Sequence, residues 1–394
     1  MGAPAVAAGV ALALALWGAQ SLVATFAAAV YRRGLPQPEI PGVEPRVAVM
    51  LPVKGTGCLA ELLLRLRAQA YGAYRIVAAV ESEDDPAFEP LCAAAAEPGA
   101  PIEMVVAGLA ENAGQKVWNL LAALERLTPA DEVVAFLDAD TLPTPLWLPR
   151  LIAVLVNSGR PVATGYRWMI PTDDRWSSAA LAAANNGIAA LPRGGLPMTI
   201  VWGGSVAIRR TTLEAIRLED YWRGAISDDL QMAEALRNAG LLAHAPRQAL
   251  LLSPVCCSWP GFVAFGLRQY RLVWLHSPAR WAIALACLWA RVIGLLCAAP
   301  ALAAGAPVAW AAVAVLIALG EARARLRRDI EAALWPEARG PQRRWVERLT
   351  RPVRHVLNAV SAAGAPLSRE IRWAGVRYRV RGPQSVTIAR RGDG

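Results

Sequence analysis

Cysteine is scarce in this chain of 394 residues, and its six cysteines do not have the spacing of a metal site. Two of the six, Cys287 and Cys297, lie inside a long apolar stretch. Structural zinc and a disulfide framework are therefore both unexpected. The sequence also has no internal repeat, and no low-complexity tract apart from its richness in alanine.

Charged residues are absent between Ala3 and Val30. This apolar run exceeds the ~20 residues that a helix needs to cross a hydrocarbon core, so we expect a transmembrane anchor over residues 1–33. A cleaved signal peptide is the alternative, but it would need basic residues before the apolar run. Here the basic pair Arg32 and Arg33 follows the run, which predicts that the downstream chain faces the cytoplasm.

A second apolar stretch, residues 281–320, is interrupted by Arg291 and by a turn-like Gly305-Ala306-Pro307. Its length suits a hairpin of two membrane spans. Four arginines follow directly, and by the positive-inside rule they return the chain to the cytoplasm: Arg323, Arg325, Arg327 and Arg328. Because a charge within a span is costly, Arg291 should face protein, mark a shallow helix, or have a function.

The net charge of +10 could indicate a nucleic-acid partner. The arginines, however, are dispersed and are most concentrated beside the apolar segments. Attraction to an anionic membrane surface explains this distribution better. We therefore expect a membrane as partner and no nucleic acid.

Between Pro45 and about Ser253, short apolar runs alternate with amphipathic segments. This alternation is typical of an α/β domain with a mostly parallel sheet, which we place at residues 45–255. The expected strands are Arg46–Val53, Tyr74–Glu81, Ile102–Ala107 and Glu132–Leu137. The expected helices are Leu59–Ala70, Pro86–Ala96 and Val117–Leu127. Ligands of open α/β sheets bind at the carboxyl ends of the strands, so the residues that follow these strands are the candidates for chemistry.

The chain after this domain is expected to lie at or in the membrane. The stretch 259–275 mixes aromatic and aliphatic residues with arginines, which predicts an amphipathic interface helix over 256–280. Residues 321–394 are predicted to be a basic interfacial region. Within it, Pro352–Leu367 is too short for a confident span and favours an interfacial or re-entrant segment. The alternating pattern of Ile371–Arg390 predicts a short pair of strands over the membrane face.

Asp138-Ala139-Asp140 follows the apolar run Val133–Leu137. A buried strand there would deliver both carboxylates to its carboxyl end. Hard oxygen ligands at such a place suit Mg²⁺ or Mn²⁺, which would bridge the diphosphate of a nucleotide-sugar. The alternative is a capping turn for a helix that begins after Thr144.

Acidic residues also occur at two further places where a helix is expected to begin. Asp84 and Asp85 precede Pro86, where they could cap the helix or bind the uracil and ribose of a nucleotide. Asp228 and Asp229 begin another helix, and a carboxylate there could cap it or take a proton from an acceptor hydroxyl.

Basic residues supply candidates for binding phosphate. Of 41 basic residues only two are lysine, Lys54 and Lys116, and both fall in predicted loops at the carboxyl edge of the sheet. A compact ammonium group there could meet phosphate or a carboxylate. Arg268 and Arg271 lie three residues apart and so on one helical face, where they could grip phosphate or touch lipid headgroups.

Seven short elements occur in a characteristic order: Pro52-Val53-Lys54-Gly55, Asp84-Asp85-Pro86-Ala87, Gln115-Lys116 with Asn119, Asp138-Ala139-Asp140, Gly203-Gly204-Ser205, Asp228-Asp229 and Arg268-Gln269-Tyr270-Arg271. This ordered set resembles the ceramide glucosyltransferase family and its bacterial relatives that glycosylate lipids, including the hopanoid-associated transferases. The resemblance covers roughly residues 45–275, and the tail 371–379 resembles the bacterial branch.

The resemblance implies a GT-A fold and inverting transfer of a hexose, most often glucose, from a UDP-sugar. It implies that Asp85, with Asp84, holds the nucleotide, and that Asp138 and Asp140 hold Mn²⁺ or Mg²⁺. The general base is then Asp229, next to the second catalytic candidate Asp228.

The resemblance also places Arg268 and Arg271 at the donor. The family has Trp directly after the second arginine, where this chain has Leu272, and this difference bears on packing beside the donor diphosphate. Lys54, Lys116 and Asp138 are expected to contribute to donor binding as well. The acceptor is expected to meet Trp202, Gly204 and Ser205.

The expected reaction is a single displacement in which Asp229 takes the proton of a lipid hydroxyl. The metal, Arg271 and Lys116 would stabilise the departing UDP. Three alternatives stay open: a processive polysaccharide synthase, which usually needs more spans, a polyprenyl-phosphate sugar transferase, and a non-catalytic membrane scaffold. We expect an integral membrane protein, in the bacterial inner membrane, with its catalytic domain in the cytoplasm.

Overall fold

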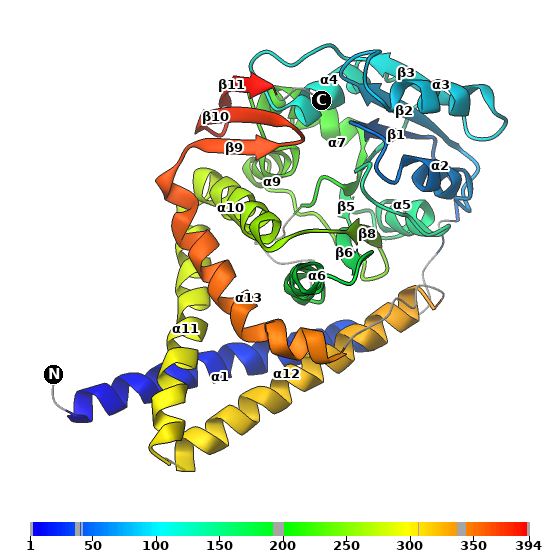
Figure 1. Cartoon of the computed structure of the whole chain (residues 1–394). Coiled ribbons are helices and arrows are strands. Elements are labelled where there is room, and N and C mark those ends of the chain that lie inside the picture. The colour runs from blue at the N-terminus through cyan, green and yellow to red at the C-terminus, as the bar shows by residue number, and fades with distance from the viewer. Residues whose placement is uncertain are drawn as a thin grey trace. The chain divides into compact units, whose positions relative to one another are not determined.

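A computed structural model describes residues 3–35, 40, 42–191, 201–305, 307–336 and 344–391 (Figure 1). The chain divides into two compact units. One, here called the helical unit, contains residues 1–36, 169–192 and 255–368. The other, the sheet unit, contains residues 37–168, 193–254 and 369–394. Each unit is therefore assembled from three separate stretches of the chain.

The sheet unit is built on a six-stranded sheet with the strand order β3-β2-β1-β4-β7-β5. Its strands are β1 (Val47–Pro52), β2 (Tyr74–Val80), β3 (Ile102–Val106), β4 (Val133–Leu137), β5 (Val162–Thr164) and β7 (Ser205–Arg209). The first four run parallel, and β7 is antiparallel to both of its neighbours. The predicted α/β class with a mostly parallel sheet is confirmed, and the four strands predicted by sequence agree within one residue at each end.

The register of the sheet decides which residues meet at its carboxyl edge. Val47 of β1 lies opposite both Tyr74 of β2 and Val133 of β4, so these strands begin and end together. Since β7 is antiparallel to β4, Leu137 at the end of β4 lies opposite Ser205 at the start of β7. The chain that enters β7 is thereby brought to the same edge as the residues that leave β1, β2 and β4.

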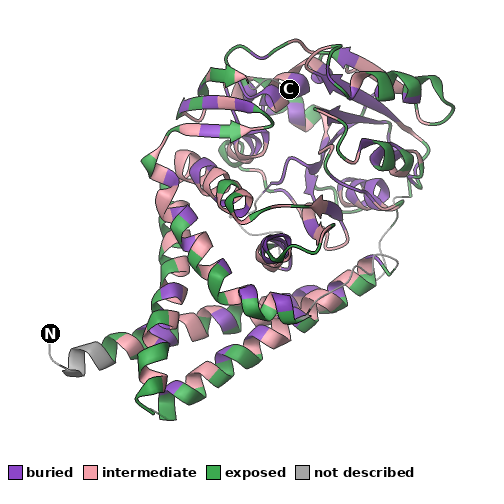
Figure 2. Ribbon diagram, in the orientation of Figure 1, coloured by how far each residue is buried: buried purple, intermediate pink, exposed green. Residues whose placement is uncertain are grey.

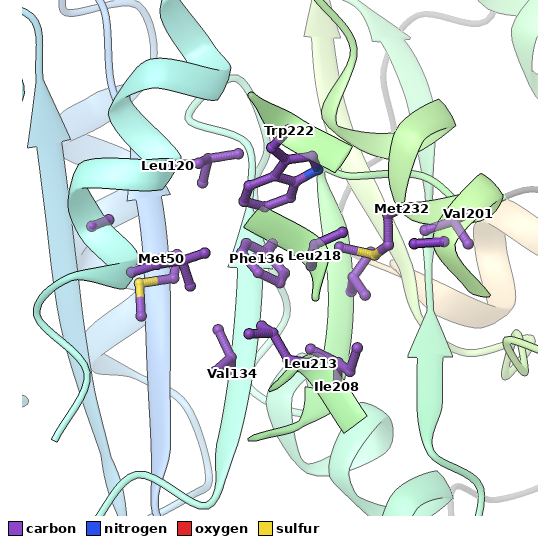
Figure 3. Close-up of a cluster of buried hydrophobic side chains, with 14 of the residues drawn as sticks. Met50, Leu120, Val134, Phe136, Val201, Ile208, Leu213, Leu218, Trp222 and Met232 are labelled. Carbon is purple, nitrogen blue, oxygen red and sulfur yellow. The ribbon is translucent and has the colours of Figure 1, made fainter. Parts of the chain in front are cut away.

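Helices cover this sheet and bury its apolar side chains. They are α2 (Leu59–Arg67), α3 (Phe88–Ala96), α4 (Gln115–Leu124), α5 (Trp147–Asn157), α7 (Arg210–Ala215), α8 (Leu218–Trp222) and α9 (Asp228–Asn238). Phe136 of β4 meets Trp222 of α8 edge to face, with their ring centroids 5.4 Å apart (Figure 3). Met50 and Leu120 belong to the same fully buried cluster. Burial of these large side chains supplies much of the driving force that fixes the sheet edge in place.

The helical unit contains α1 (Ala3–Arg33), α6 (Trp176–Ala189), α10 (Trp259–His276), α11 (Pro278–Ala303), α12 (Pro307–Leu334) and α13 (Arg344–Gly364), and a 3-10 turn follows at Ala365–Leu367. Three of its helices, α1, α11 and α12, are long and apolar enough to cross a membrane. Leu14, Ala298 and Leu316 form a small buried cluster between them. Figure 2 shows long exposed faces on these helices, as expected for surfaces that contact lipid. A two-stranded sheet of β6 (Tyr166–Pro171) and β8 (Leu250–Val255) completes the fold.

The C-terminal tail forms three strands, so the predicted pair of strands was wrong in number. They are β9 (Glu370–Trp373), β10 (Val376–Gly382) and β11 (Ser385–Arg391), with β10 in the middle. A tight turn at Ala374 and Gly375, both with positive φ, joins β9 to β10. The sheet belongs to the sheet unit, where the hydroxyl of Tyr378 accepts a hydrogen bond from the backbone N–H of Gln115 at 3.1 Å.

A buried ion pair stabilises the sheet unit at the other end of its strands. Nε and Nη2 of Arg75 on β2 donate to the two carboxylate oxygens of Asp131 at 3.1 and 2.7 Å. Asp131 has no exposed surface, and its Oδ2 also accepts from the backbone N–H of Thr128 at 2.8 Å. Burial alone would raise the pKa of Asp131, but the hydrogen bonds from Arg75 and Thr128 outweigh it and lower the pKa below its usual value.

We expect Asp131→Asn to destabilise the protein by about 3 kcal/mol at neutral pH, because it leaves a buried guanidinium short of its partner. Folding lowers the pKa of Asp131. The stability advantage of the wild type over the variant is therefore complete at pH values above the pKa that Asp131 has in the unfolded protein. It should shrink as the pH falls below about 4. Thermal unfolding of both proteins over a pH series measures this. Glu103→Gln is the matched control, since Glu103 binds the same arginine at 2.7 Å but is 41% exposed; equal losses in the two variants would contradict the prediction.

Candidate active site

Polar residues from five segments converge at the carboxyl edge of the sheet unit. Lys54 follows β1, Glu81 follows β2, and Asp138 follows β4. Helices α4 and α9 begin at this edge, with Lys116 in the first turn of α4 and Asp228 at the first position of α9. The register of the strands therefore brings together residues that lie far apart in the sequence.

Lys116 is the central cation of this group. Its Nζ lies 2.6 Å from Oδ1 of Asp138 and 2.9 Å from Oδ2 of Asp228. Burial lowers the pKa of Lys116, but the carboxylates of Asp138, Asp228 and Asp229 outweigh this and raise the pKa above its usual value. Lys116 is therefore protonated at neutral pH and holds two carboxylates in place.

Asp228 and Asp229 are adjacent in sequence but have different surroundings. Asp228 is buried, which raises its pKa to about 6 against the opposing effect of Lys116. Asp229 is half-buried, and its Oδ1 accepts from the backbone N–H of Leu230 at 2.8 Å and from the hydroxyl of Ser227. Ser227 is the N-cap of α9, so a fixed helix end positions both carboxylates.

Two glycines allow the backbone before β7 to approach these carboxylates. A Cβ atom at Gly203 would overlap the carboxylate of Asp228, and one at Gly204 would lie 2.5 Å from Oδ2 of Asp138. The carbonyl of Gly204 also accepts a hydrogen bond from the N–H of Asp138 at 3.2 Å. Any side chain at these two positions would push the loop away from the acidic residues.

Asp140 lies at the open side of the group. Its side chain is 64% exposed, against 18% for Asp138, and Nη1 of Arg167 lies 4.0 Å from its Oδ2. The guanidinium of Arg167 in turn lies over the ring of Trp202, 5.3 Å from its centroid. The ring of Tyr166 meets Trp202 edge to face at 5.6 Å. A solvent-facing carboxylate is thus flanked by a cation and by two aromatic rings.

The carboxylates of Asp138 and Asp140 suit a divalent metal that arrives with a phosphate ligand. Within the described residues there is no group of three or more His, Cys, Asp and Glu side chains that could hold a metal ion. Mg²⁺ and similar hard ions are commonly bound by one or two carboxylates, with water and substrate phosphates as the remaining ligands. The donor set at this edge fits that mode of binding.

Further contacts hold the loops on the β1 and β2 side of the site. Oδ1 of the buried Asp85 accepts from the backbone N–H groups of Gly55 and Ala87, both at 2.9 Å. Lys54 forms an ion pair with Glu81. Asp85 therefore orders the loop that carries Lys54, while its neighbour Asp84 is exposed.

The C-terminal tail contributes contacts that the sequence did not predict. Nη2 of Arg391 donates to the carbonyl of Ala110 at 2.7 Å, and its Nη1 donates to Oε1 of Gln115 at 3.2 Å. Nη1 also lies 3.6 Å from a carboxylate oxygen of Glu81, the partner of Lys54. The only sequence signal for these contacts is the alternating, basic character of the tail, which does not specify what the tail meets. Arg167 was missed because it lies in β6, a strand that the sequence pattern does not reveal.

The remaining predicted site residues have varied environments. Trp202 is 4% exposed, and Ser205 is fully buried with its hydroxyl bonded to Nε1 of Trp147 at 2.9 Å. Arg268 and Arg271 lie on α10 in the helical unit, where Nε of Arg271 donates to the carbonyl of Ala365 at 3.0 Å. Their contact with the donor stays a prediction.

A mostly parallel α/β sheet with acidic residues and glycines at its carboxyl edge is the arrangement of a GT-A nucleotide-sugar transferase. The sequence model of the family described as "Glycosyltransferase like family 2" matches residues 45–282, which is more than half of the chain. The protein belongs to this family and is a glycosyltransferase that uses a nucleotide-sugar.

One solved structure agrees with this fold. A mannosyltransferase from Pyrobaculum calidifontis, in complex with GDP-mannose and Mn²⁺, is similar with a TM-score of 0.52 and 22% identity, over 83% of this chain and 99% of that chain. Glucosyl-3-phosphoglycerate synthase from Mycobacterium tuberculosis has a TM-score of 0.36 and 14% identity, over 59% of this chain and 80% of that chain. No curated protein has a significantly similar sequence.

Proposed function

We propose that this protein transfers a hexose, most simply glucose, from a UDP-sugar to the hydroxyl of a membrane lipid such as ceramide or a related bacterial lipid. The observation that carries the proposal is the charged group at the sheet edge, in which Lys116 bridges Asp138 and Asp228. Three apolar helices in the same chain support a lipid as acceptor over a soluble sugar. The similarity to ceramide glucosyltransferases and hopanoid-associated transferases favours the same acceptor class.

The donor diphosphate is proposed to bind beside Asp138 and Asp140, the two residues that would hold Mn²⁺ or Mg²⁺. When bound, such a metal ion neutralises negative charge on the leaving group. Lys116 adds a fixed positive charge next to Asp138, where it favours the departing UDP. Lys54, Asp84 and Asp85 are proposed to bind the nucleotide, because the Asp85 carboxylate links the loop after β2 to the loop after β1 that carries Lys54.

Asp229 is proposed as the general base. It is half-buried at the start of α9, whereas Asp228 is buried and paired with Lys116. Oδ2 of Asp228 is already occupied by the ammonium group of Lys116 at 2.9 Å, so Asp228 is better suited to position Lys116. Asp229 would take the proton of the acceptor hydroxyl as that oxygen attacks the anomeric carbon on the face opposite UDP, which inverts its configuration.

The acceptor is proposed to meet the loop before β7. The backbone of Gly204 and the ring of Trp202 flank the carboxylates there. The hydroxyl of Ser205 is bonded to Trp147, so we assign Ser205 to holding this loop. We propose that the sheet unit faces the cytoplasm, because the positive-inside rule favours that side for the basic residues at the end of α1 and in the C-terminal half of α12. Arg268 and Arg271 are proposed to reach the donor diphosphate.

Membranes that contain the protein, incubated with a panel of radiolabelled UDP-sugars and then extracted for lipid, test this proposal. We expect radiolabel in an alkali-stable glycolipid without phosphate, with UDP-glucose as the best donor. A product that carries phosphate would instead identify a polyprenyl-phosphate sugar transferase. Label that stays in the aqueous phase with every donor would overturn the lipid acceptor. Membranes with Asp138→Asn are the control for label that enters lipid by other routes.

A further inference from the structure

Arginine residues form a compact cluster in the helical unit that the proposed transfer reaction does not use. The cluster consists of Arg291 on α11, Arg323 and Arg327 on α12, and Arg351 and Arg354 on α13. Arg323 lies within electrostatic range of Arg291, Arg327 and Arg351, and Arg354 lies within range of Arg323, Arg327 and Arg351. This arginine cluster includes the charge that was unexpected within a predicted span, Arg291.

Protein groups neutralise only part of the charge of this cluster. Nε of Arg291 donates to the side-chain amide oxygen of Gln20, and Nη1 of Arg323 donates to the carbonyl of Ser21, both at 3.0 Å. These two partners are uncharged. Arg327 pairs with Glu347, and Arg351 pairs with Glu321 at 3.3 Å. Among the residues that the structure describes, these five guanidinium groups thus meet two carboxylates, one of which, Glu321, also accepts from Nη2 of Arg348 at 2.7 Å, and this leaves an excess of positive charge.

Arg354 is the least satisfied member of the cluster. It is 8% exposed, and its Nη1 is buried without a hydrogen-bond partner among the described residues. Burial and the nearby Arg327 lower the pKa of Arg354 to about 9. Its guanidinium is therefore still charged at neutral pH. Glu347, which already pairs with Arg327, is the carboxylate that acts on Arg354. A buried guanidinium whose charge is only partly compensated costs free energy, and an anion from outside the protein would lower that cost.

The chemistry of the cluster points to phosphate. A planar guanidinium group binds phosphate with two parallel hydrogen bonds, and several such groups around one anion are typical of phosphate recognition. A phosphate monoester or diester carries enough charge and enough oxygen atoms to satisfy more than one of these arginines. A neutral ligand would leave their charge uncompensated.

The surroundings of the cluster indicate that a membrane lipid supplies this phosphate. Arg291, Arg323 and Arg327 lie on helices that are apolar enough to span a membrane. α13 carries Arg354 on its buried side and an exposed apolar stripe at helical spacing: Trp345, Leu349, Val353, Val356 and Val360. A helix with such a stripe lies in the headgroup region of a bilayer, at the depth of lipid phosphates.

We propose that the arginine cluster binds the phosphate of an anionic membrane lipid headgroup, such as phosphatidylglycerol. The site is separate from the acidic residues of the sheet unit, and the proposal does not depend on which sugar or acceptor the enzyme uses. The bound lipid holds α11, α12 and α13 together by neutralising their mutual repulsion. Activity of the enzyme in membranes of neutral lipid is then lower because this helix group is less stable.

Thermal unfolding of the delipidated full chain in neutral detergent, titrated with phosphatidylglycerol or phosphatidylcholine, tests the proposal. We expect phosphatidylglycerol to raise the melting temperature and phosphatidylcholine to leave it unchanged. Arg354→Gln should weaken the apparent affinity for phosphatidylglycerol by about tenfold, the effect of one charge-assisted hydrogen bond. Without lipid, the same variant should melt no lower than wild type, because it removes one of the repelling charges.

Arg325→Gln is the matched control, because this substitution removes the same charge from an exposed position on α12. It should keep the wild-type affinity. Arg323→Gln, a second change within the cluster, should also weaken the affinity for phosphatidylglycerol. It keeps the test decisive if Arg354→Gln does not fold. Equal responses to the two lipids, or a loss as large in Arg325→Gln as in Arg354→Gln, would overturn the proposal. Inorganic phosphate is tested beside the two lipids. If it alone raised the melting temperature as much as phosphatidylglycerol does, the assignment to a lipid would be wrong.

Discussion

Lys116→Met is expected to abolish sugar transfer and to lower the stability of the folded protein by about 3 to 5 kcal/mol. The reason is that Lys116 separates two carboxylates that would otherwise face each other, Asp138 at 2.6 Å and the buried Asp228 at 2.9 Å. Without the ammonium group, Asp228 becomes a buried charge without a partner. Thermal unfolding of the full chain in detergent and the rate of label transfer to lipid measure the two effects.

Lys54→Met is the control for this prediction, since it removes the only other lysine of the chain. Lys54 is 32% exposed, and its partner Glu81 also lies near Arg391. A partly exposed pair contributes at most about 1 kcal/mol, so this variant should unfold close to the wild-type temperature. If the two variants lost equal stability, Lys116 would not have the central structural role assigned to it.

Asp229→Asn is expected to reduce the turnover number by a factor of about 10² to 10⁴ and to leave donor binding nearly unchanged. The amide keeps the shape of the carboxylate and can still accept the hydrogen bond from the N–H of Leu230, so α9 should begin at the same residue. It cannot accept the proton of the acceptor hydroxyl. Isothermal titration with UDP and Mn²⁺ measures binding, and single-turnover transfer measures the chemical step.

Asp228→Asn distinguishes the roles of the two adjacent carboxylates. It weakens the contact with Lys116, so we expect it to lower donor affinity and stability together with activity. Full turnover in Asp229→Asn would exclude Asp229 as the base. Metal-independent binding of UDP by the wild type would separately count against Asp138 and Asp140 as metal ligands.

The sequence was sufficient for four of the six strands of the central sheet, because these four are short apolar runs that end in polar residues. Val133–Leu137 is buried throughout, and the position of Asp138 at its carboxyl end follows from that strand. The closeness of Lys116 to Asp138 and Asp228 could be anticipated only in part. Both lysines were expected at this edge, but the pairing depends on the strand order and on where α4 and α9 begin.

Contacts between distant parts of the chain could not be predicted in this way. The bond from Gln115 to Tyr378 joins residues 263 positions apart, and no local pattern encodes it. The third strand of the tail was missed for the same reason, since β9 is short and is ordered by its pairing with β10. Arg291 shows the opposite case. The cost of a charge in an apolar helix predicted that Arg291 would face protein, mark a shallow helix or have a function, and its bond to Gln20 agrees with the first of these.

The contacts of the C-terminal sheet have a consequence for the biogenesis of the enzyme. The ribosome makes β9, β10 and β11 after α11 and α12, so the apolar helices leave the ribosome before the strands that bind Gln115 and Glu81 exist. The contacts that complete the carboxyl edge of the sheet therefore form only after these apolar helices have been made. A nascent chain that lacks these strands also lacks the contacts with Gln115 and Glu81, so this edge of the sheet depends on a part of the chain that is made late.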